Sequence, residues 1–323
     1  MAKEANATVS REEELKKVSI MSMVRTLLPI AGLIVVFVIF NVLTKGRMVT
    51  KFDLVMSQMY VTLIAATGVF FIMTMGGLDF SQGSILGMAS IVVCMLSKKS
   101  IPLAVVGGIA TGAAIGAING FFYVNRKIKS FIVTICTMFL FRGVIKYLTS
   151  NSPVAGDIKL ITLGMNNNFK MACTAVVLIL GFIVFRFTRF GIDLKAIGAG
   201  EKAAKFAGIR TDRMKFLIYV LAGAITGFAA FINSIKVGSV TSSGGNQLET
   251  QILIALVLGG MPISGGAKAN FLNVIIGSML YTVLTAGLNM MGMTTQAMQL
   301  VQGVVFLIFV WVFADRQSLQ VIK

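Results

Sequence analysis

The sequence predicts an all-α polytopic membrane protein with about ten transmembrane helices, some of them short or broken, and with both termini in the cytoplasm. Three observations support this fold class. Hydrophobic residues make up 56% of the 323 residues and charged residues only 13%, whereas a soluble domain is about a quarter charged. Long apolar runs recur along most of the chain. The 29 Lys and Arg residues, against 12 Asp and Glu, gather in alternate segments between these runs.

The apolar runs define the candidate spans. Several are shorter than the ~20 residues that a perpendicular transmembrane helix needs. Short spans interrupted by glycine are typical of broken or tilted helices that line an internal path. In chain order, the ten expected spans are 27–43, 54–76, 83–97, 101–124, 130–149, 169–188, 214–235, 248–261, 269–288 and 296–314.

The orientation follows from the basic residues. With the N-terminus inside, the segments assigned to the cytoplasm carry more than twice as many Lys and Arg residues as those assigned to the outside. Lys45, Arg47 and Lys51 oppose this assignment and make the first hairpin its weakest part. The formal net charge of +17 is explained by the same bias, so we expect contact with membrane lipid and no nucleic-acid binding.

The residue inventory argues against an enzyme. The chain has no histidine, which excludes a Ser/His/Asp or Cys/His catalytic set, and its three cysteines are too few and too far apart for a metal site. No segment matches the nucleotide loop GxxxxGK[ST]. Two isolated acids near span ends, Asp79 and Glu249, make a poor proton relay. We therefore expect no catalytic residue, metal or bound cofactor, and a transporter would need an energy source on another chain.

Two polar, glycine-rich breaks interrupt the spans. They are GGLDFSQGS at 76–84 and GGMPISGG at 259–266, which share the form GGxxxSxG and allow a diverged internal repeat. Non-helical backbone at membrane depth is tolerated where it is buried in protein or lines a cavity, although plain turns between helices are the alternative. The candidate path-lining residues are Asp79, Ser81, Ser84, Asn119, Glu249 and Asn289.

Asp79 has two possible roles in the first break. It either caps the following helix or lines a path near the cytoplasmic mouth.

The fourth span carries glycine at every fourth position. Gly108, Gly112, Gly116 and Gly120 form a flat strip on one helix face, where a second helix backbone can approach closely. We expect this strip to serve helix packing.

Residues 189–215 form the longest polar interruption of the apolar chain. Gly200 and Glu201 suit a helix start, Glu201 and Lys205 have the favourable i,i+4 spacing, and Gly208 suits a helix end. A helix of about two turns is too short to be stable alone. It is either a solvated loop helix or a docking element for a soluble partner.

Several motifs, in one order along residues 54–314, resemble the permease subunit of bacterial ABC importers for monosaccharides of the ribose, galactose and xylose type. GGLDFSQGS resembles that family's GG-x-D-L-S-V-G-S signature, and the segments at 128–145, 190–209, 259–266 and 284–303 resemble its later motifs. The chain departs from the family at Gly200, where Asn is common, and at Pro262, where a small polar residue is usual.

The resemblance implies a domain organisation. Residues 1–26 would be a cytoplasmic N-terminal segment, residues 27–315 a single transmembrane permease domain, and residues 316–323 a cytoplasmic tail. Residues 189–215 would be a cytoplasmic loop that docks on an ATPase. Its docking residues would be Gly198, Gly200, Glu201, Lys202, Ala203, Ala204, Lys205, Phe206, Ala207 and Gly208.

The resemblance also implies partners. Two copies of this subunit, or a closely related pair, would surround one path in the bacterial cytoplasmic membrane. Cytoplasmic ATPase subunits would bind the ATP, and an extracytoplasmic binding protein would deliver a monosaccharide. The alternatives are another polar solute, such as a nucleoside, a branched-chain amino acid or a signalling furanose, and a self-sufficient carrier or channel. The polar breaks argue against a membrane scaffold without transport.

Overall fold

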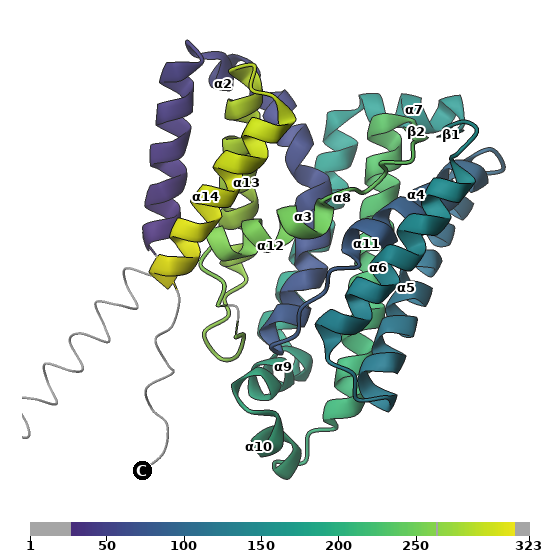
Figure 1. Ribbon diagram of the computed structural model, residues 1–323, viewed down its shortest axis with the longest axis vertical. Helices are drawn as coiled ribbons and strands as arrows, with labels where there is room; N and C mark the ends of the chain where they lie inside the picture. The colour runs from purple at the N-terminus through teal and green to yellow at the C-terminus, as the bar shows by residue number, and fades with distance from the viewer. Residues whose placement is uncertain (1–26, 263, 314–323) are drawn as a thin grey trace, which may run out of the picture.

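The computed structural model describes residues 27–262 and 264–313 (Figure 1). The expected N-terminal segment 1–26 and tail 316–323 lie outside these residues. Helices dominate the described part. In chain order they are Leu27–Leu43, α2 Arg47–Thr50, α3 Phe52–Thr74, α4 Gln82–Ser97, α5 Ile101–Asn125, α6 Ser130–Leu148, α7 Ile158–Met165, α8 Asn167–Phe187, α9 Arg189–Ala199, α10 Glu201–Phe206, α11 Thr211–Val237, α12 Leu248–Leu258, α13 Leu272–Met290 and α14 Thr295–Phe313.

Most of each expected span lies in a helix, which confirms a nearly all-α chain. Among the described residues, six helices are long and apolar enough to cross a membrane: α3, α5, α6, α8, α11 and α13. The count of ten spans and the cytoplasmic location of both termini stay predictions. Three helices were not expected: α2 and α7 have only four and eight residues, and α9 lies within the polar stretch.

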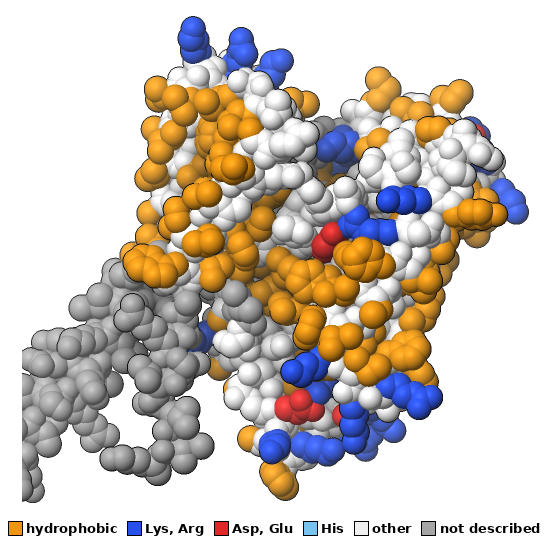
Figure 2. All heavy atoms as spheres, in the orientation of Figure 1, with side chains coloured by type: hydrophobic (Ala, Val, Ile, Leu, Met, Phe, Trp, Pro, Cys, Tyr) orange, Lys and Arg blue, Asp and Glu red, His pale blue; other side chains and the backbone are white. Residues whose placement is uncertain are grey.

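The helices form one bundle with two unlike ends (Figure 1). One end carries α7 and a small antiparallel sheet, in which Val154 of β1 (Val154–Ala155) faces Val240 of β2 (Ser239–Val240). The other end carries α9 and α10. Helix α3 lies between α4, α5, α6 and α11 on one side and α13, α14 and the helix Leu27–Leu43 on the other. In Figure 2 apolar side chains occupy much of the visible face between the two ends, with a few charged side chains among them, and further basic side chains lie at both ends.

Helices α5 and α11 pack backbone to backbone along the glycine strip. A Cβ added to Gly112 would lie 2.0 Å from the carbonyl oxygen of Gly223, and one added to Gly108 would lie 2.9 Å from that of Gly227. A Cβ on Gly116 would lie 2.1 Å from the carbonyl oxygen of Tyr219. Only glycine fits at these contacts, which is how small residues let membrane helices associate closely.

The two glycine-rich breaks begin with the same kind of helix stop. Gly76 (φ 81°) follows α3 and Gly260 (φ 86°) follows α12, and each adopts the left-handed conformation that favours glycine. The next amide in each case, Gly77 N and Met261 N, bonds back to the carbonyl oxygens of Ile72 and Leu256.

However, residues at matching positions of the shared form GGxxxSxG do not have equivalent backbone conformations. The left-handed residue is the first glycine of one break and the second glycine of the other. The first break also leads directly into α4, whereas α13 starts only at Leu272. The two breaks are therefore not superimposable repeats in the register that the motif suggests.

Gly112→Ala should destabilise the bundle, because its new methyl group would collide with the backbone of α11. Overpacking of this kind costs about 1–3 kcal/mol. Gly303→Ala on α14 is the matched control, since nothing lies within 4 Å of a Cβ added there. Thermal unfolding of the detergent-solubilised protein should show a lower midpoint for Gly112→Ala alone. Equal midpoints for the two variants would mean that the α5–α11 contact does not limit stability.

Candidate functional site

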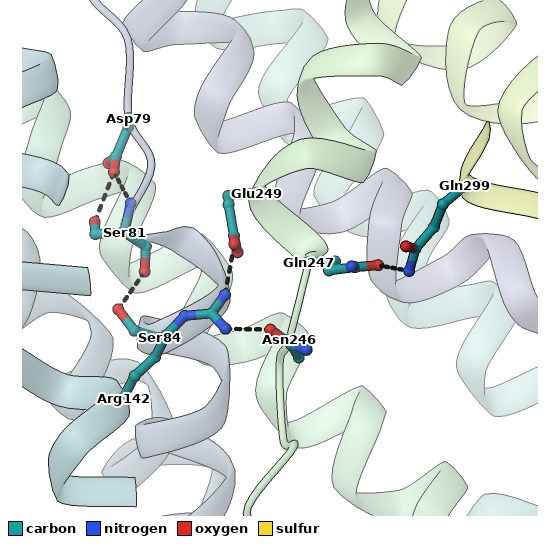
Figure 3. A network of polar contacts seen from close by, with 8 residues as sticks. All are labelled: Asp79, Ser81, Ser84, Arg142, Asn246, Gln247, Glu249 and Gln299. Atoms are coloured by element: carbon teal, nitrogen blue, oxygen red, sulfur yellow. Dashed lines mark hydrogen bonds and ion pairs between the residues drawn. The ribbon is translucent and has the colours of Figure 1, made fainter. Parts of the chain in front are cut away.

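The carboxylate of Asp79 organises the first break. Its Oδ1 accepts hydrogen bonds from the backbone nitrogen of Ser81 at 2.7 Å and from the Ser81 hydroxyl at 2.6 Å, and its Oδ2 accepts one from Gln82 Nε2 at 2.7 Å (Figure 3 shows the Ser81 contacts). Asp79 thus closes a turn onto the residue two positions later, as Asp commonly does. It does not bond an amide within α4, so it is not a helix cap in the strict sense.

A second ring of polar contacts ties this turn to α5 and α11. Asn119 Nδ2 of α5 donates to the Ser81 hydroxyl at 2.8 Å, and Thr226 of α11 donates to Gln82 Oε1. Ser84 donates its hydroxyl to the Ser81 carbonyl at 2.7 Å. All of these side chains are buried. In this conformation they contact protein groups, and a role in lining the path stays a prediction.

Helix α6 satisfies two further amides of the break. Leu78 N donates to the Ser130 hydroxyl at 3.4 Å and Phe80 N donates to the Thr134 hydroxyl at 3.1 Å. The break therefore lies inside the bundle. Asn119, its partner on α5, is roughly 9 Å from the end of that helix at 1.5 Å per residue. The position of the turn near the cytoplasmic mouth stays a prediction.

A charged pair joins α6 to the start of α12. Arg142 donates to a carboxylate oxygen of Glu249, which is 7% exposed, and to the side-chain oxygen of Asn246 (Figure 3). Sequence reasoning proposed Glu249 but missed Arg142 and Asn246. The available signal was an arginine within an apolar span, because ionisable residues at membrane depth are costly and mark functional positions.

The first break and the start of α12 touch each other through glycine. A Cβ on Gly83 of α4 would lie 2.0 Å from the free carboxylate oxygen Oε2 of Glu249 and 2.3 Å from the carbonyl oxygen of Gly245. The N-terminal ends of α4 and α12 thus converge on the two carboxylates Asp79 and Glu249, and helix N-termini favour negative charge. Asn289, at the exposed end of α13, is not part of this cluster.

The polar stretch at the opposite end forms two helices. Gly200 separates α9 from α10, and Gly208 in the left-handed conformation ends the turn after α10, with Ile209 N bonded to the Ala204 carbonyl at 3.1 Å. Glu201 pairs with Lys215 of α11, and no contact with Lys205 is present among the described ion pairs. The expected i,i+4 pair is thus replaced by a contact that fastens α10 to the bundle.

Helix α10 presents an exposed apolar face. Phe206 is 93% exposed, Ala203 and Ala207 are exposed beside it, and Lys202 and Lys205 are exposed on the same short helix. Ala204 is only 3% exposed and packs inward. Of the expected docking residues, Ala204 is therefore unavailable to a partner in this conformation.

Helix α9 packs against both glycine-rich breaks. A Cβ on Gly198 would lie 2.1 Å from the carbonyl oxygen of Thr74, at the end of α3, and 2.6 Å from Gly266 N. Gly266 N in turn donates to the Thr74 carbonyl at 2.8 Å. The polar stretch, the first break and the second break therefore meet at one point.

Comparison with known proteins matches residues 52–310 to the family described as branched-chain amino acid transport system / permease component. The ribose import permease protein RbsC of Bacillus subtilis (strain 168) is 30% identical over 96% of this chain and 99% of its own length. The L-arabinose ABC transporter permease protein AraH of Azospirillum brasilense is 29% identical over 87% of this chain and 86% of its own.

A third relative is the xylose transport system permease protein XylH of Haemophilus influenzae, which is 24% identical over 88% of this chain and 94% of its own length. No solved structure matches the chain with significance.

Asp79→Asn should be tolerated, because Asn keeps one carboxamide oxygen for Ser81, and Gln82 can rotate its amide to accept from the new NH₂ group. Asp79→Leu should destabilise the protein, because it leaves the donors of Ser81 and Gln82 buried without an acceptor. Each such group lowers the stability by about 1–3 kcal/mol. Thermal unfolding in detergent checks the difference. If Asp79→Asn lowers the midpoint as far as Asp79→Leu does, the negative charge itself, and not hydrogen bonding, holds the turn.

Proposed function

The chain belongs to the family of permease components of the branched-chain amino acid transport system, and we propose that it forms the translocation path of an ATP-driven importer for a monosaccharide. The similarity to a ribose import permease protein along nearly the full length of both chains carries this proposal. The relatives described above are named as permease proteins for ribose, L-arabinose and xylose. Other polar solutes, branched-chain amino acids among them, are the alternative for the same architecture.

The energy source is proposed to be an ATPase on separate chains. Helix α10 supports this part, because a short helix with an exposed phenylalanine at a basic end gains little from facing water. A small apolar face of this kind fits a groove on a soluble partner. The end that carries α9 and α10 is then the cytoplasmic side of a bacterial cytoplasmic membrane.

The complete importer is proposed to contain a second copy of this chain or a close relative, two ATPase subunits and an extracytoplasmic binding protein. The end that carries α7 and the β1–β2 pair would receive the binding protein. The chain itself would bind no nucleotide, metal or cofactor.

Reconstitution tests the proposed function. The chain is incorporated into liposomes with a candidate ATPase and a candidate binding protein, and uptake of labelled solutes is measured with and without ATP. We expect ATP-dependent uptake of one monosaccharide, and none of leucine or of a nucleoside. Uptake that persists without the ATPase would favour a self-sufficient carrier, and uptake of leucine alone would assign the alternative solute class.

Phe206→Asp should abolish ATP-dependent uptake, because it places a charge on the apolar face that we expect to enter the ATPase. Phe206→Leu is the matched control and should retain most of the activity, since it keeps an apolar side chain of similar reach. Because Phe206 is 93% exposed, neither variant should change the thermal stability of the isolated subunit. Co-purification of the ATPase with each variant gives a second measurement, and equal recovery with Phe206→Asp would contradict docking through α10.

A further inference from the structure

The segment 241–247, which joins β2 to α12, runs down the side of α4 without forming a helix. Two glycine contacts fix its course. A Cβ on Gly87 would lie 2.6 Å from the carbonyl oxygen of Gly244, and a Cβ on Gly245 would lie 2.0 Å from that of Gly83. Gly83 is near the start of α4 and Ser97 is at its end, roughly 20 Å apart at 1.5 Å per residue. The segment therefore reaches well into a hydrocarbon layer about 30 Å thick.

This segment is polar and open at that depth. Ser242, Ser243 and Asn246 are not buried. Four backbone bonds involve it: Gly244 N donates to the Thr241 carbonyl at 2.9 Å and Asn246 N to the Ser243 carbonyl at 3.0 Å, while the carbonyls of Gly245 and Gln247 accept from Leu248 N and Gln251 N of α12. They bond only part of the amides and carbonyls of the segment. Irregular backbone does not face lipid, because its free amides and carbonyls would lose their partners. The exposed side of the segment must therefore meet water or another protein surface.

A pocket of about 480 Å³ lies between this segment and α6. Its lining includes Phe139, Arg142 and Lys146 from α6, and Ser242, Ser243 and Asn246 from the segment. Small-molecule pockets usually measure about 300–1,000 Å³. The space is therefore large enough for a molecule of monosaccharide size.

The groups around this pocket suit a neutral molecule with several hydroxyl groups. Glu249 balances the charge of Arg142. The Asn246 side chain directs its oxygen toward Arg142, so that its amide nitrogen points away from the guanidinium (Figure 3). That NH₂ group and two serine hydroxyls offer donors and acceptors. Lys146, one turn nearer the end of α6, is exposed and adds a single positive charge at the rim.

We propose that residues 241–247 and Arg142 line the water-filled part of the solute path, and that Ser242, Ser243 and Asn246 contact the hydroxyl groups of the passing solute. Glu249 is a positioning residue, which holds Arg142 and through it the Asn246 side chain. This inference rests on the proposed function and names the part of the chain that meets the solute.

Thiol labelling tests the inference in the assembled importer. Ser243→Cys is introduced into a chain in which Cys94, Cys136 and Cys173 are replaced by alanine, and the reconstituted complex is exposed to a hydrophilic, membrane-impermeant thiol reagent. Ser150→Cys is the matched control, because Ser150 is exposed beyond the end of α6 and does not line the pocket. We expect both cysteines to react, and the bulky adduct to lower sugar uptake more than tenfold at Ser243→Cys and not at Ser150→Cys.

Two results would overturn the inference. An unreactive Ser243→Cys would show that a second copy or lipid covers the segment, and a labelled Ser243→Cys with unchanged uptake would show that solute does not pass it. Asn246→Ala tests the solute contact itself. We expect it to lower uptake severalfold without changing ATPase binding, and unchanged uptake would contradict the contact. A wild-type complex that imports no sugar would instead contradict the proposed function, and the labelling result would still decide whether the segment faces water.

Discussion

Every backbone amide and carbonyl at membrane depth needs a partner, and this constraint explains where the chain departs from helix. The long helices satisfy it internally. The first break satisfies it with side chains, because Ser130, Thr134 and Asp79 accept from its amides. The segment 241–247 does so only in part, and its residues Ser242, Ser243 and Asn246 are exposed. We therefore infer different functions for the two kinds of irregular backbone: the first holds the bundle together, and the second is available to water and solute.

Glycine lets two backbones approach each other closely at three places. It lets α5 meet α11, lets the segment 241–247 lie on α4, and lets α9 touch the end of α3 and the second break at Gly198. The third contact connects the proposed docking helix α10 to both breaks through backbone atoms, with no flexible side chain between them. In such an arrangement, a displacement of α9 must move the end of α3, since close-packed backbones cannot absorb it locally.

Local signals in the sequence were sufficient for much of this architecture. Hydropathy placed the helices, and the residue types at Gly200 and Gly208 placed the ends of α10, because these depend on neighbouring residues. Contacts between distant residues were not predictable in the same way. Arg142 meets Asn246 across 104 positions, and Glu201 pairs with Lys215 of another helix instead of Lys205. Helix α9 was missed because Arg189, Asp193 and Lys195 make it part of a polar stretch, and because the burial of its apolar residues is a tertiary effect.

Hydrogen exchange of the importer in lipid nanodiscs tests most directly whether the two kinds of irregular backbone differ. Residues 76–81 and 242–247 lie outside the regular helices, and we infer that both segments lie at membrane depth. Depth alone would then give their amides similar protection. The account predicts slow exchange at Leu78, Phe80 and Ser81, whose amides are bonded inside the protein, and fast exchange at Ser242, Ser243 and Gln247. Equal protection of both segments would contradict it.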